Sequence, residues 1–255
     1  MTELKQIDQE VQALMWQMRT ETLSKMQQPF NVDEKSGRKD LVTTVDKSNE
    51  KAIVAKLREL DPDAQILGEE GFGDQIEQTA GRVWLIDPLD GTMNFVMQQN
   101  NFAIMISLYE DGVGVLGYIM DVMNAQLYHG DTKSVFVNNK QIEPPTNLHL
   151  RDALIGISGP LLINNDHNMQ VIAKKSRGPR MYGSAGIEFA KVMSGELIGY
   201  ISYLRPWDFA AGKILAQTLN LQVKAIDGGP LSMLSSNVVL VATERASEEV
   251  ITLAN

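Results

Sequence analysis

Hydrophobic residues recur every three or four positions over residues 3–26, and this spacing predicts one long amphipathic helix. A polar loop follows at 29–40, and a β-rich run at 41–45 predicts a short strand. The amphipathic spacing returns over 47–60 and predicts a second helix. Asp46 directly precedes that helix, so we expect it to be the N-cap.

From residue 64 onward, short apolar runs bounded by turn residues predict many strands. In the first half these runs lie at 65–68, 83–86, 102–109, 113–122, 126–129 and 135–137. Asp111-Gly112 and Asn138-Asn139 are typical of hairpin turns, which predicts antiparallel pairing. In the second half the expected strands lie at 153–158, 197–203, 221–225 and 238–242, and the expected helices at 165–175, 184–194, 208–219 and after 242. Helices that alternate with sheets predict a layered α/β (α+β) fold.

The chain of 255 residues shows no internal repeat, low-complexity tract or linker. At roughly 100–200 residues per domain, this length allows one large domain or two small ones. We therefore expect a single domain over 1–255, with an N-terminal α+β part at about 1–145 and a C-terminal α/β part at about 146–255.

Acidic residues outnumber basic ones by 32 to 23, which gives a formal net charge of −9. This excess argues against nucleic acid or an anionic membrane surface as the partner. The longest apolar stretch, at 102–109, is too short to span a membrane, and the N-terminal segment lacks the apolar region of a signal peptide. The absence of cysteine excludes disulfides, thiolate metal sites and a cysteine nucleophile. We therefore expect a cytoplasmic protein.

Three segments place carboxylates at the ends of predicted elements. The first, Gly68-Glu69-Glu70-Gly71, follows the strand predicted at 65–68 and, alone, is most simply an exposed turn. The third, at 206–212, contains Asp208 at the start of a predicted helix. Asp208 is therefore either the N-cap of that helix or part of a site shared with the other carboxylates.

The second segment, at 84–95, is the most informative. An apolar strand runs into Asp87 and Asp90, and Gly91-Thr92 then open a turn or helix whose free amides suit a phosphate. Carboxylates beside that phosphate would repel it unless a cation lay between them. Oxygen ligands without cysteine select a hard ion such as Mg²⁺ or Mn²⁺. The alternative interpretation is a proline-containing turn that is merely rich in aspartate.

Together these segments resemble the inositol monophosphatase family of Mg²⁺-dependent, lithium-sensitive phosphatases, in a bacterial-type form. The matching segments are 40–46, 68–70, 84–95, 183–186 and 207–212, and the resemblance extends over about 35–245. It implies a single phosphatase domain with a layered αβαβα sandwich of the inositol monophosphatase and fructose-1,6-bisphosphatase type. It also implies a homodimer that hydrolyses a small phosphorylated metabolite by metal-activated water.

The resemblance also implies a set of metal ligands. Glu69, Asp87 and the backbone carbonyl of Leu89 would hold one Mg²⁺. A second ion would be held by Asp87, Asp90 and Asp208, so that Asp87 bridges the two. A third, weaker ion would use Glu69. Two to three ions are therefore expected, and Mn²⁺ could substitute for Mg²⁺.

The same resemblance assigns roles around the metals. Thr92, hydrogen-bonded to Asp46, would orient the attacking water together with Glu69. The amides of Gly91 and Thr92 would bind the phosphate, beside Asp90. Glu70 adjoins the site and would act through water. Further substrate contacts are expected from Ser184, Glu188 and Arg205.

The resemblance leaves the substrate open. In inositol-preferring relatives a glutamate seven residues before the Trp-Asp aspartate contacts the sugar hydroxyls, and Ile201 stands at that position. The same metals would serve an NADP(H) 2′-phosphatase, a fructose-1,6-bisphosphatase or a 3′-phosphoadenosine 5′-phosphate phosphatase, and a metal-dependent binding protein without turnover is a further alternative. A basic cluster precedes the segment 183–186: Lys174, Lys175, Arg177 and Arg180. It is either a solvated helix end or a clamp for a second phosphate.

Overall fold

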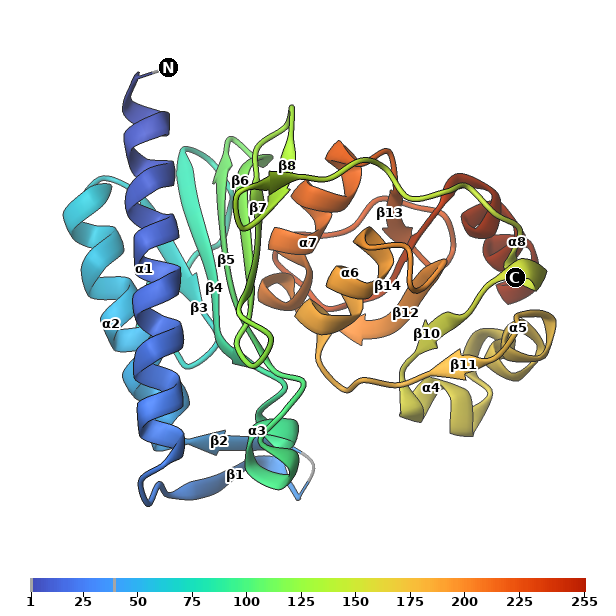
Figure 1. Cartoon of the computed structure of the whole chain (residues 1–255), viewed down its shortest axis with the longest axis horizontal. Coiled ribbons are helices and arrows are strands. Elements are labelled where there is room, and N and C mark those ends of the chain that lie inside the picture. Colours follow the sequence, from blue (N-terminus) through green and yellow to red (C-terminus); the bar gives the residue numbers. More distant parts are fainter. Residues whose placement is uncertain (1, 39) are drawn as a thin grey trace.

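The computed structural model describes residues 2–38 and 40–255. Its elements form five layers in the order helix, sheet, helix, sheet, helix (Figure 1), which is the αβαβα sandwich that the sequence implies. One outer layer contains α1 (Thr2–Met26) and α2 (Thr44–Leu60), the middle layer α6 (Ala185–Met193) and α7 (Pro206–Thr218), and the other outer layer α4 (Gly159–Asn164), α5 (Met169–Lys175) and α8 (Glu244–Ala254).

Seven strands form the larger sheet in the order of the chain. They are β3 (Gln65–Gly68), β4 (Arg82–Asp90), β5 (Ala103–Glu110), β6 (Val113–Asp121), β7 (Gln126–Gly130), β8 (Val135–Val137) and β9 (Lys140–Gln141). β3 and β4 are parallel, and every later pair is antiparallel. The turns at Asp111-Gly112 and Asn138-Asn139 join antiparallel strands, as predicted.

Five strands form the smaller sheet in the order β11-β10-β12-β14-β13. Their bounds are β10 (Ile155–Ile157), β11 (Pro179–Arg180), β12 (Gly199–Leu204), β13 (Gln222–Ala225) and β14 (Asn237–Ala242). The short 3₁₀ turns η1 (Leu150–Asp152) and η2 (Asp166–Asn168) complete this part. The hydrophobic pattern did not predict α4, and it placed the start of α5 at 165 instead of Met169, because three residues from Asn165 to Asn168 have positive φ and interrupt the helix.

The N-terminal region corrects two expectations. The segment 29–40 contains β1 (Val32–Gly37), which forms an antiparallel hairpin with β2 (Asp40–Thr43). Most side chains of β1 are exposed, so no hydrophobic pattern marks it. α2 begins at Thr44, and its N-cap is Thr43 and not Asp46. Asp46 stands at the third helical position, where its carboxylate accepts the Thr43 backbone N–H at 2.9 Å and closes a capping box.

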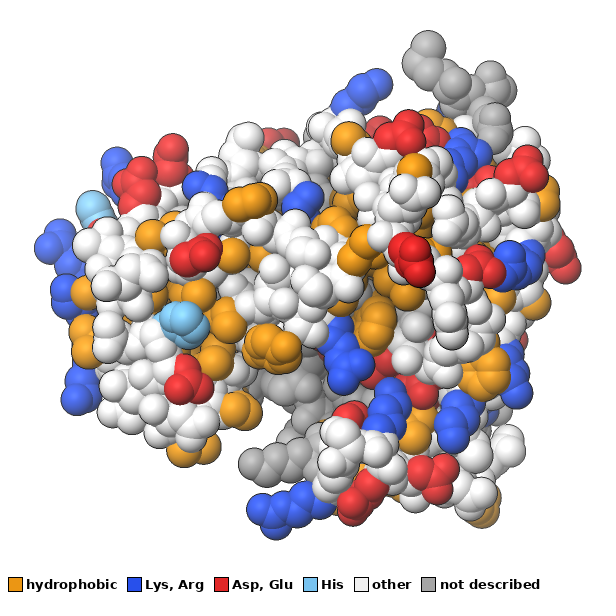
Figure 2. Space-filling model, turned by 180° about the vertical axis from the view of Figure 1, so that it is seen from behind, with side chains coloured by type: hydrophobic (Ala, Val, Ile, Leu, Met, Phe, Trp, Pro, Cys, Tyr) orange, Lys and Arg blue, Asp and Glu red, His pale blue; other side chains and the backbone are white. Residues whose placement is uncertain are grey.

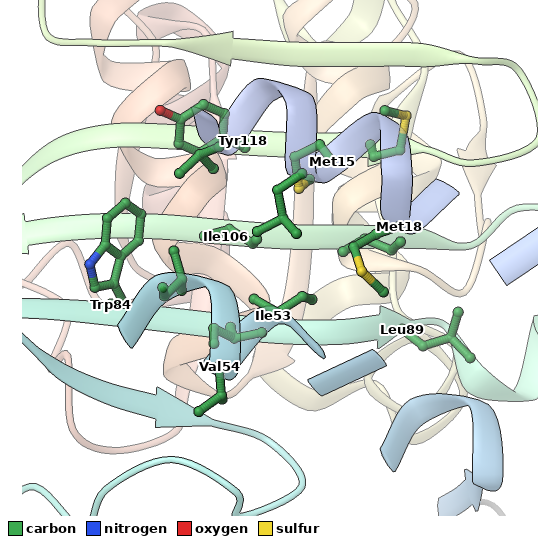
Figure 3. Packing of buried hydrophobic residues seen from close by; sticks show 14 of the residues in the cluster. Met15, Met18, Ile53, Val54, Trp84, Leu89, Ile106 and Tyr118 are labelled. Atoms are coloured by element: carbon green, nitrogen blue, oxygen red, sulfur yellow. The ribbon is translucent and has the colours of Figure 1, made fainter. Parts of the chain in front are cut away.

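The outer core between α1, α2 and the larger sheet anchors the end of β4. Met15 and Met18 from α1 and Ile53 from α2 are fully buried and belong to the same hydrophobic cluster as Trp84 of β4 (Figure 3). Leu89, near the end of β4, belongs to the same cluster and is 1% exposed. Burial of each such side chain contributes about 1.5–3 kcal/mol. The strand end that carries the candidate ligands is therefore held by the core.

The middle layer joins the two parts of the chain. Its hydrophobic cluster combines Met105 and Ile119 of the larger sheet, Phe189 of α6 and Val241 of the smaller sheet. Gly212 of α7 permits close contact, since a Cβ there would overlap the Phe189 ring. The two parts of the chain therefore share one hydrophobic cluster.

The surface carries both signs of charge. Figure 2 shows acidic and basic side chains scattered among uncharged ones, with both signs present on the face in view. This mixture agrees with a modest net charge of −9 spread over 255 residues. Within residues 2–38 and 40–255, no helix has both the length and the apolar character that a membrane crossing requires.

Candidate active site

A cavity of about 350 Å³ opens where the end of β4 meets α3 (Thr92–Gln98), α6 and α7. It brings together most of the residues predicted from the sequence: Glu69, Asp87, Leu89, Asp90, Gly91, Thr92, Ser184, Glu188 and Asp208. Asp46, Glu70 and Arg205 do not line it. Among the described residues, no lysine or arginine lines the cavity. Its charged lining is therefore entirely acidic.

A bulge in β4 directs its two aspartates into the cavity. The pairing of β4 with β5 shifts between Asp87 and Asp90, so three steps along β4 match two along β5. Asp87 is 2% exposed, and within residues 2–38 and 40–255 its one hydrogen bond is from the Leu89 backbone N–H to Oδ1, at 3.1 Å. Burial, followed by the charges of Glu69, Asp90 and Asp208, raises the pKa of Asp87 well above its usual value.

Asp90 connects β4 to the start of α6. Its carboxylate accepts hydrogen bonds from the Ser184 hydroxyl, from Ala185 N at 2.9 Å and from Gly186 N at 2.7 Å. Burial raises the pKa of Asp90 to about 6, although these three donors favour the ionised form. Ser184 thus serves as the N-cap of α6 and also positions Asp90.

Asp208 does not have the N-cap position that the sequence suggested. α7 begins at Pro206, so Arg205 is the N-cap residue and Asp208 stands at the third helical position. There Asp208 Oδ2 accepts the Arg205 backbone N–H at 2.8 Å, while the carboxylate still lines the cavity. Burial, followed by the charges of Glu69 and Asp90, raises its pKa well above the usual value. The exposed Arg205 side chain lies against the Trp207 ring, 5.6 Å from its centroid.

The glutamate pair lies in the turn after β3 and contacts a residue that sequence reasoning missed. Lys35 of β1 places its Nζ 2.9 Å from Glu69 Oε1 and 2.5 Å from Glu70 Oε1. Burial raises the pKa of Glu70 to about 7, although Lys35 favours its ionised form. A single lysine in a polar segment carries no sequence signal, so only the hairpin reveals this contact.

The predicted hydrogen bond between Thr92 and Asp46 is present. Thr92 Oγ1 lies 2.8 Å from Asp46 Oδ1 and 3.1 Å from the carbonyl oxygen of Leu89. Gly91, the N-cap of α3, has a φ of +87°, and a Cβ there would lie 3.0 Å from the Ser184 Cβ. Glycine is therefore required at the turn that brings Thr92 to the end of β4.

The far end of the cavity contains Glu188, which is 1% exposed. Its Oε1 accepts the Tyr182 backbone N–H at 2.8 Å, and its Oε2 has no hydrogen-bond partner among the described residues. Burial, followed by the charge of Asp90, raises the pKa of Glu188 to about 7. An unpartnered carboxylate oxygen beside a cavity is costly unless a ligand or solvent satisfies it.

Ile201 and the basic cluster both lie away from the cavity. Ile201 is fully buried in the cluster between the smaller sheet and the outer helices, because side chains alternate along β12. Its neighbours Tyr200 and Ser202 line the cavity instead. The basic cluster is exposed on α5 and near β11, and none of its four members lines the cavity. Its arrangement is that of a solvated surface.

The donors in the cavity suit a hard divalent cation. Every candidate ligand offers oxygen, from the carboxylates of Glu69, Asp87, Asp90 and Asp208 or from the Leu89 carbonyl. A bound cation would stabilise the ionised forms that burial disfavours. In the described part of the chain, no three His, Cys, Asp or Glu side chains are grouped closely enough to hold a metal ion between them. The oxygen donors of the cavity thus suit Mg²⁺ in their chemistry, but their side chains are not arranged around a common point.

Comparison with known proteins gives a consistent result. The model of the inositol monophosphatase family matches residues 1–255. The inositol-1-monophosphatase of Bacillus subtilis is 37% identical over 246 residues, which cover 94% of this chain and 93% of that protein. A solved IMPase/NADP phosphatase complexed with Mg²⁺ and phosphate superposes with a TM-score of 0.91 at 27% identity, covering 98% of this chain and 95% of that one.

A lithium-soaked inhibitory complex of staphylococcal inositol monophosphatase-1 superposes with a TM-score of 0.92, again at 27% identity, covering 98% of this chain and 94% of that one. These likenesses extend over nearly the whole chain and include the layered fold and the segments that build the cavity. The chain therefore belongs to the inositol monophosphatase family, whose members are phosphatases that act on phosphate monoesters.

Proposed function

We propose that this phosphatase hydrolyses the phosphate monoester of a small polyhydroxylated metabolite, such as an inositol phosphate, with two to three Mg²⁺ ions. The observation that carries the proposal is the convergence of four carboxylates, from Glu69, Asp87, Asp90 and Asp208, on one cavity beside Gly91-Thr92. Three separate segments supply these groups, namely the turn after β3, the end of β4 and the first turn of α7, and a purely structural role would not require this convergence. The fit of Mg²⁺ and phosphate to a structural neighbour supports the same assignment.

Asp87, Asp90 and Asp208 would keep their hydrogen bonds to backbone N–H groups while their carboxylates hold cations. Glu69, Asp87 and the Leu89 carbonyl would hold one ion, and Asp87, Asp90 and Asp208 a second, with Mn²⁺ able to replace Mg²⁺. A third, weaker ion would use Glu69. The chemistry supplied by such ions is polarisation of the phosphoryl oxygens, activation of water and stabilisation of the leaving alkoxide.

The chain's own residues would orient the reactants. Thr92 Oγ1, held by Asp46 at 2.8 Å, would direct the attacking water together with Glu69. The amides of Gly91 and Thr92 would bind the phosphate, since both residues line the cavity at the start of α3. Glu70 lies behind Glu69 and would act through Lys35 or water, because it does not reach the cavity.

The acidic lining favours substrates with a single phosphate in the cavity. A second phosphate, as in fructose 1,6-bisphosphate or 3′-phosphoadenosine 5′-phosphate, would find no lysine or arginine among the described lining residues. NADP 2′-phosphatase activity is the second candidate, because a structural neighbour is named for both activities. We propose inositol phosphates first and NADP second.

Phosphate release from a substrate panel tests the proposal. The panel contains myo-inositol 1-phosphate, NADP, fructose 1,6-bisphosphate and 3′-phosphoadenosine 5′-phosphate, each with a Mg²⁺ titration and with LiCl as inhibitor. We expect Mg²⁺-dependent, lithium-inhibited release, fastest with inositol 1-phosphate. Turnover that is independent of divalent metal, or no turnover while Mg²⁺ binds, would reject the proposal in favour of another chemistry or a binding role.

Glu188 is expected to select the alcohol half of the substrate. The Glu188 carboxylate and the nearby Tyr200 and Ser202 line the cavity and would form hydrogen bonds to hydroxyl groups of the substrate. Glu188→Gln should raise KM for inositol 1-phosphate about tenfold, since a mispaired buried polar contact costs on the order of 1–2 kcal/mol. It should leave KM for p-nitrophenyl phosphate, which has no hydroxyl groups to recognise, nearly unchanged. Equal changes for both substrates would contradict the role, and the exposed Glu248→Gln on α8 is the matched control.

We also propose that the protein is a cytoplasmic homodimer. The lack of cysteine suits a reducing compartment. Met97 of α3 and Ile163 of α4 are 69% and 77% exposed, and large exposed apolar side chains of this kind are suited to an interface. Light scattering should report a mass of twice 28.3 kDa, and a monomer at micromolar concentration would refute the dimer.

A further inference from the structure

A buried glutamate outside the cavity holds the turn that presents Glu69 and Glu70. Glu50, on α2, is 0% exposed. Its Oε2 accepts the backbone N–H of Glu70 at 2.7 Å, and its Oε1 accepts the backbone N–H of Phe72 at 2.8 Å. One side chain therefore fixes two amides in the short stretch that follows β3.

The fit between Glu50 and this turn depends on Gly68. A Cβ at residue 68 would overlap the Glu50 carboxylate, so the glycine gives the carboxylate access to the turn. On the other side of the turn, Glu69 N donates to the Ile86 carbonyl across a longer distance of 3.3 Å. Glu50 thus supplies the shorter hydrogen bonds on the C-terminal side of Glu69.

The two amides that Glu50 binds account for an acidic residue at this buried position. Glu50 is buried near Glu69, and burial raises its pKa, so its charge is unfavourable for folding. Two N–H donors nevertheless converge on its two oxygens, and only a carboxylate offers two acceptors in that geometry. A glutamine would oppose one of the amides with its own NH₂ group.

We infer that Glu50 is a positioning residue, which sets the affinity of the metal site by fixing the orientation of Glu69 and Glu70. This role rests on the metal site proposed above. Groups that orient a metal ligand from behind typically change metal affinity 10–100-fold when they are replaced. Glu50 contacts neither substrate nor cavity, so its effect passes entirely through the turn.

The test compares Glu50→Gln with wild type by Mg²⁺ titration calorimetry and by hydrogen exchange at the amides of Glu70 and Phe72. We expect Mg²⁺ affinity to fall about tenfold, both amides to exchange faster, and kcat at saturating Mg²⁺ to change less than about threefold. Glu59→Gln, on the exposed face of the same helix, is the control and should match wild type.

A second variant guards against misfolding. In Gly68→Ala the new Cβ would overlap the Glu50 carboxylate and displace it from the amides of the turn. This variant should therefore lower Mg²⁺ affinity as Glu50→Gln does. The inference would be overturned if either variant showed faster amide exchange or a lower melting temperature but bound Mg²⁺ as tightly as wild type. Glu50 would then have a structural role alone. Failure of wild type itself to bind Mg²⁺ would instead overturn the proposed metal site, so the two failures are distinguishable.

Discussion

Replacing Asp87 by asparagine is expected to abolish Mg²⁺-dependent hydrolysis and, at the same time, to raise the melting temperature of the metal-free protein. Asp87 is the proposed bridging ligand, so hydrolysis should fall at least about 10²-fold, as for loss of a main electrostatic group in other enzymes. The stability gain follows because Asp87 is 2% exposed, has a single hydrogen bond among the residues that the structure describes, and is repelled by Glu69, Asp90 and Asp208. Asparagine keeps the bond to Leu89 and removes the charge.

Differential scanning calorimetry in EDTA and phosphate-release assays measure the two effects. Asp61→Asn is the matched control, because Asp61 is also buried but accepts hydrogen bonds from Trp84 Nε1 and Arg82. Loss of its carboxylate should lower the melting temperature and leave Mg²⁺-dependent hydrolysis without the fall of about 10²-fold. Asp90 is a less suitable target, since it also accepts three hydrogen bonds that hold the start of α6. Retained Mg²⁺-dependent activity in Asp87→Asn would contradict the assignment.

The metal-free protein should lose stability as the pH rises, and Mg²⁺ should reverse that loss. Burial raises the pKa of Asp90 to about 6 and that of Glu70 to about 7, against about 4 in an unfolded chain. Between pH 4 and 7 the folded protein therefore binds more protons than the unfolded chain, so the free energy of unfolding falls with rising pH. The stability that Asp90 and Glu70 contribute is therefore greatest below about pH 4–5, and it is lost as the pH rises through 6–7.

Melting temperatures measured at pH 5.5 and pH 8, with EDTA or with excess Mg²⁺, check this sign. At 100 times its Kd, Mg²⁺ should raise the melting temperature by roughly 5–10 °C at pH 8. The rise should be smaller at pH 5.5, where protons compete for the carboxylates. KCl of equal ionic strength controls for screening. A stabilisation by Mg²⁺ that is the same at both pH values would contradict the account.

The sequence predicted the layered fold because its strands and turns follow local rules. The buried runs of β4 and β5 are apolar, and Asp111-Gly112 and Asn138-Asn139 tolerate the positive φ of tight turns. The hairpin strand β1 was missed because its side chains are exposed and carry no hydrophobic alternation. Its partner was visible because two of the four residues of β2 are buried.

Most of the residues that line the cavity could be named from the sequence and the family resemblance, whereas Arg205 was expected there and lies outside it. Asp87 and Asp90 stand at the end of an apolar strand, where the sequence itself marks a site. Asp46 was expected to be an N-cap, and an N-cap was one of two interpretations of Asp208, yet both stand at the third helical position, from which a carboxylate can also bond to the cap residue. The orientation of Ile201 away from the cavity could not be read from the sequence position alone, because successive residues of a strand point to opposite faces.

The contacts of Lys35 and Glu50 could not be predicted from the sequence. Lys35 meets the glutamate pair only through the β1–β2 hairpin, 34 residues before Glu69. Glu50 looks like an ordinary polar residue of an amphipathic helix until α2 packs against the turn after β3. Both contacts arise from tertiary packing that local patterns do not encode.

Crystals grown with Mn²⁺ and inorganic phosphate test the central claim most directly, through anomalous difference density at the manganese absorption edge. The account predicts at least two peaks in the cavity, bonded to Glu69, Asp87, Asp90 and Asp208, with phosphate next to Gly91-Thr92. Absence of a peak in the cavity, or peaks held by other residues while these carboxylates keep only their present partners, would contradict it.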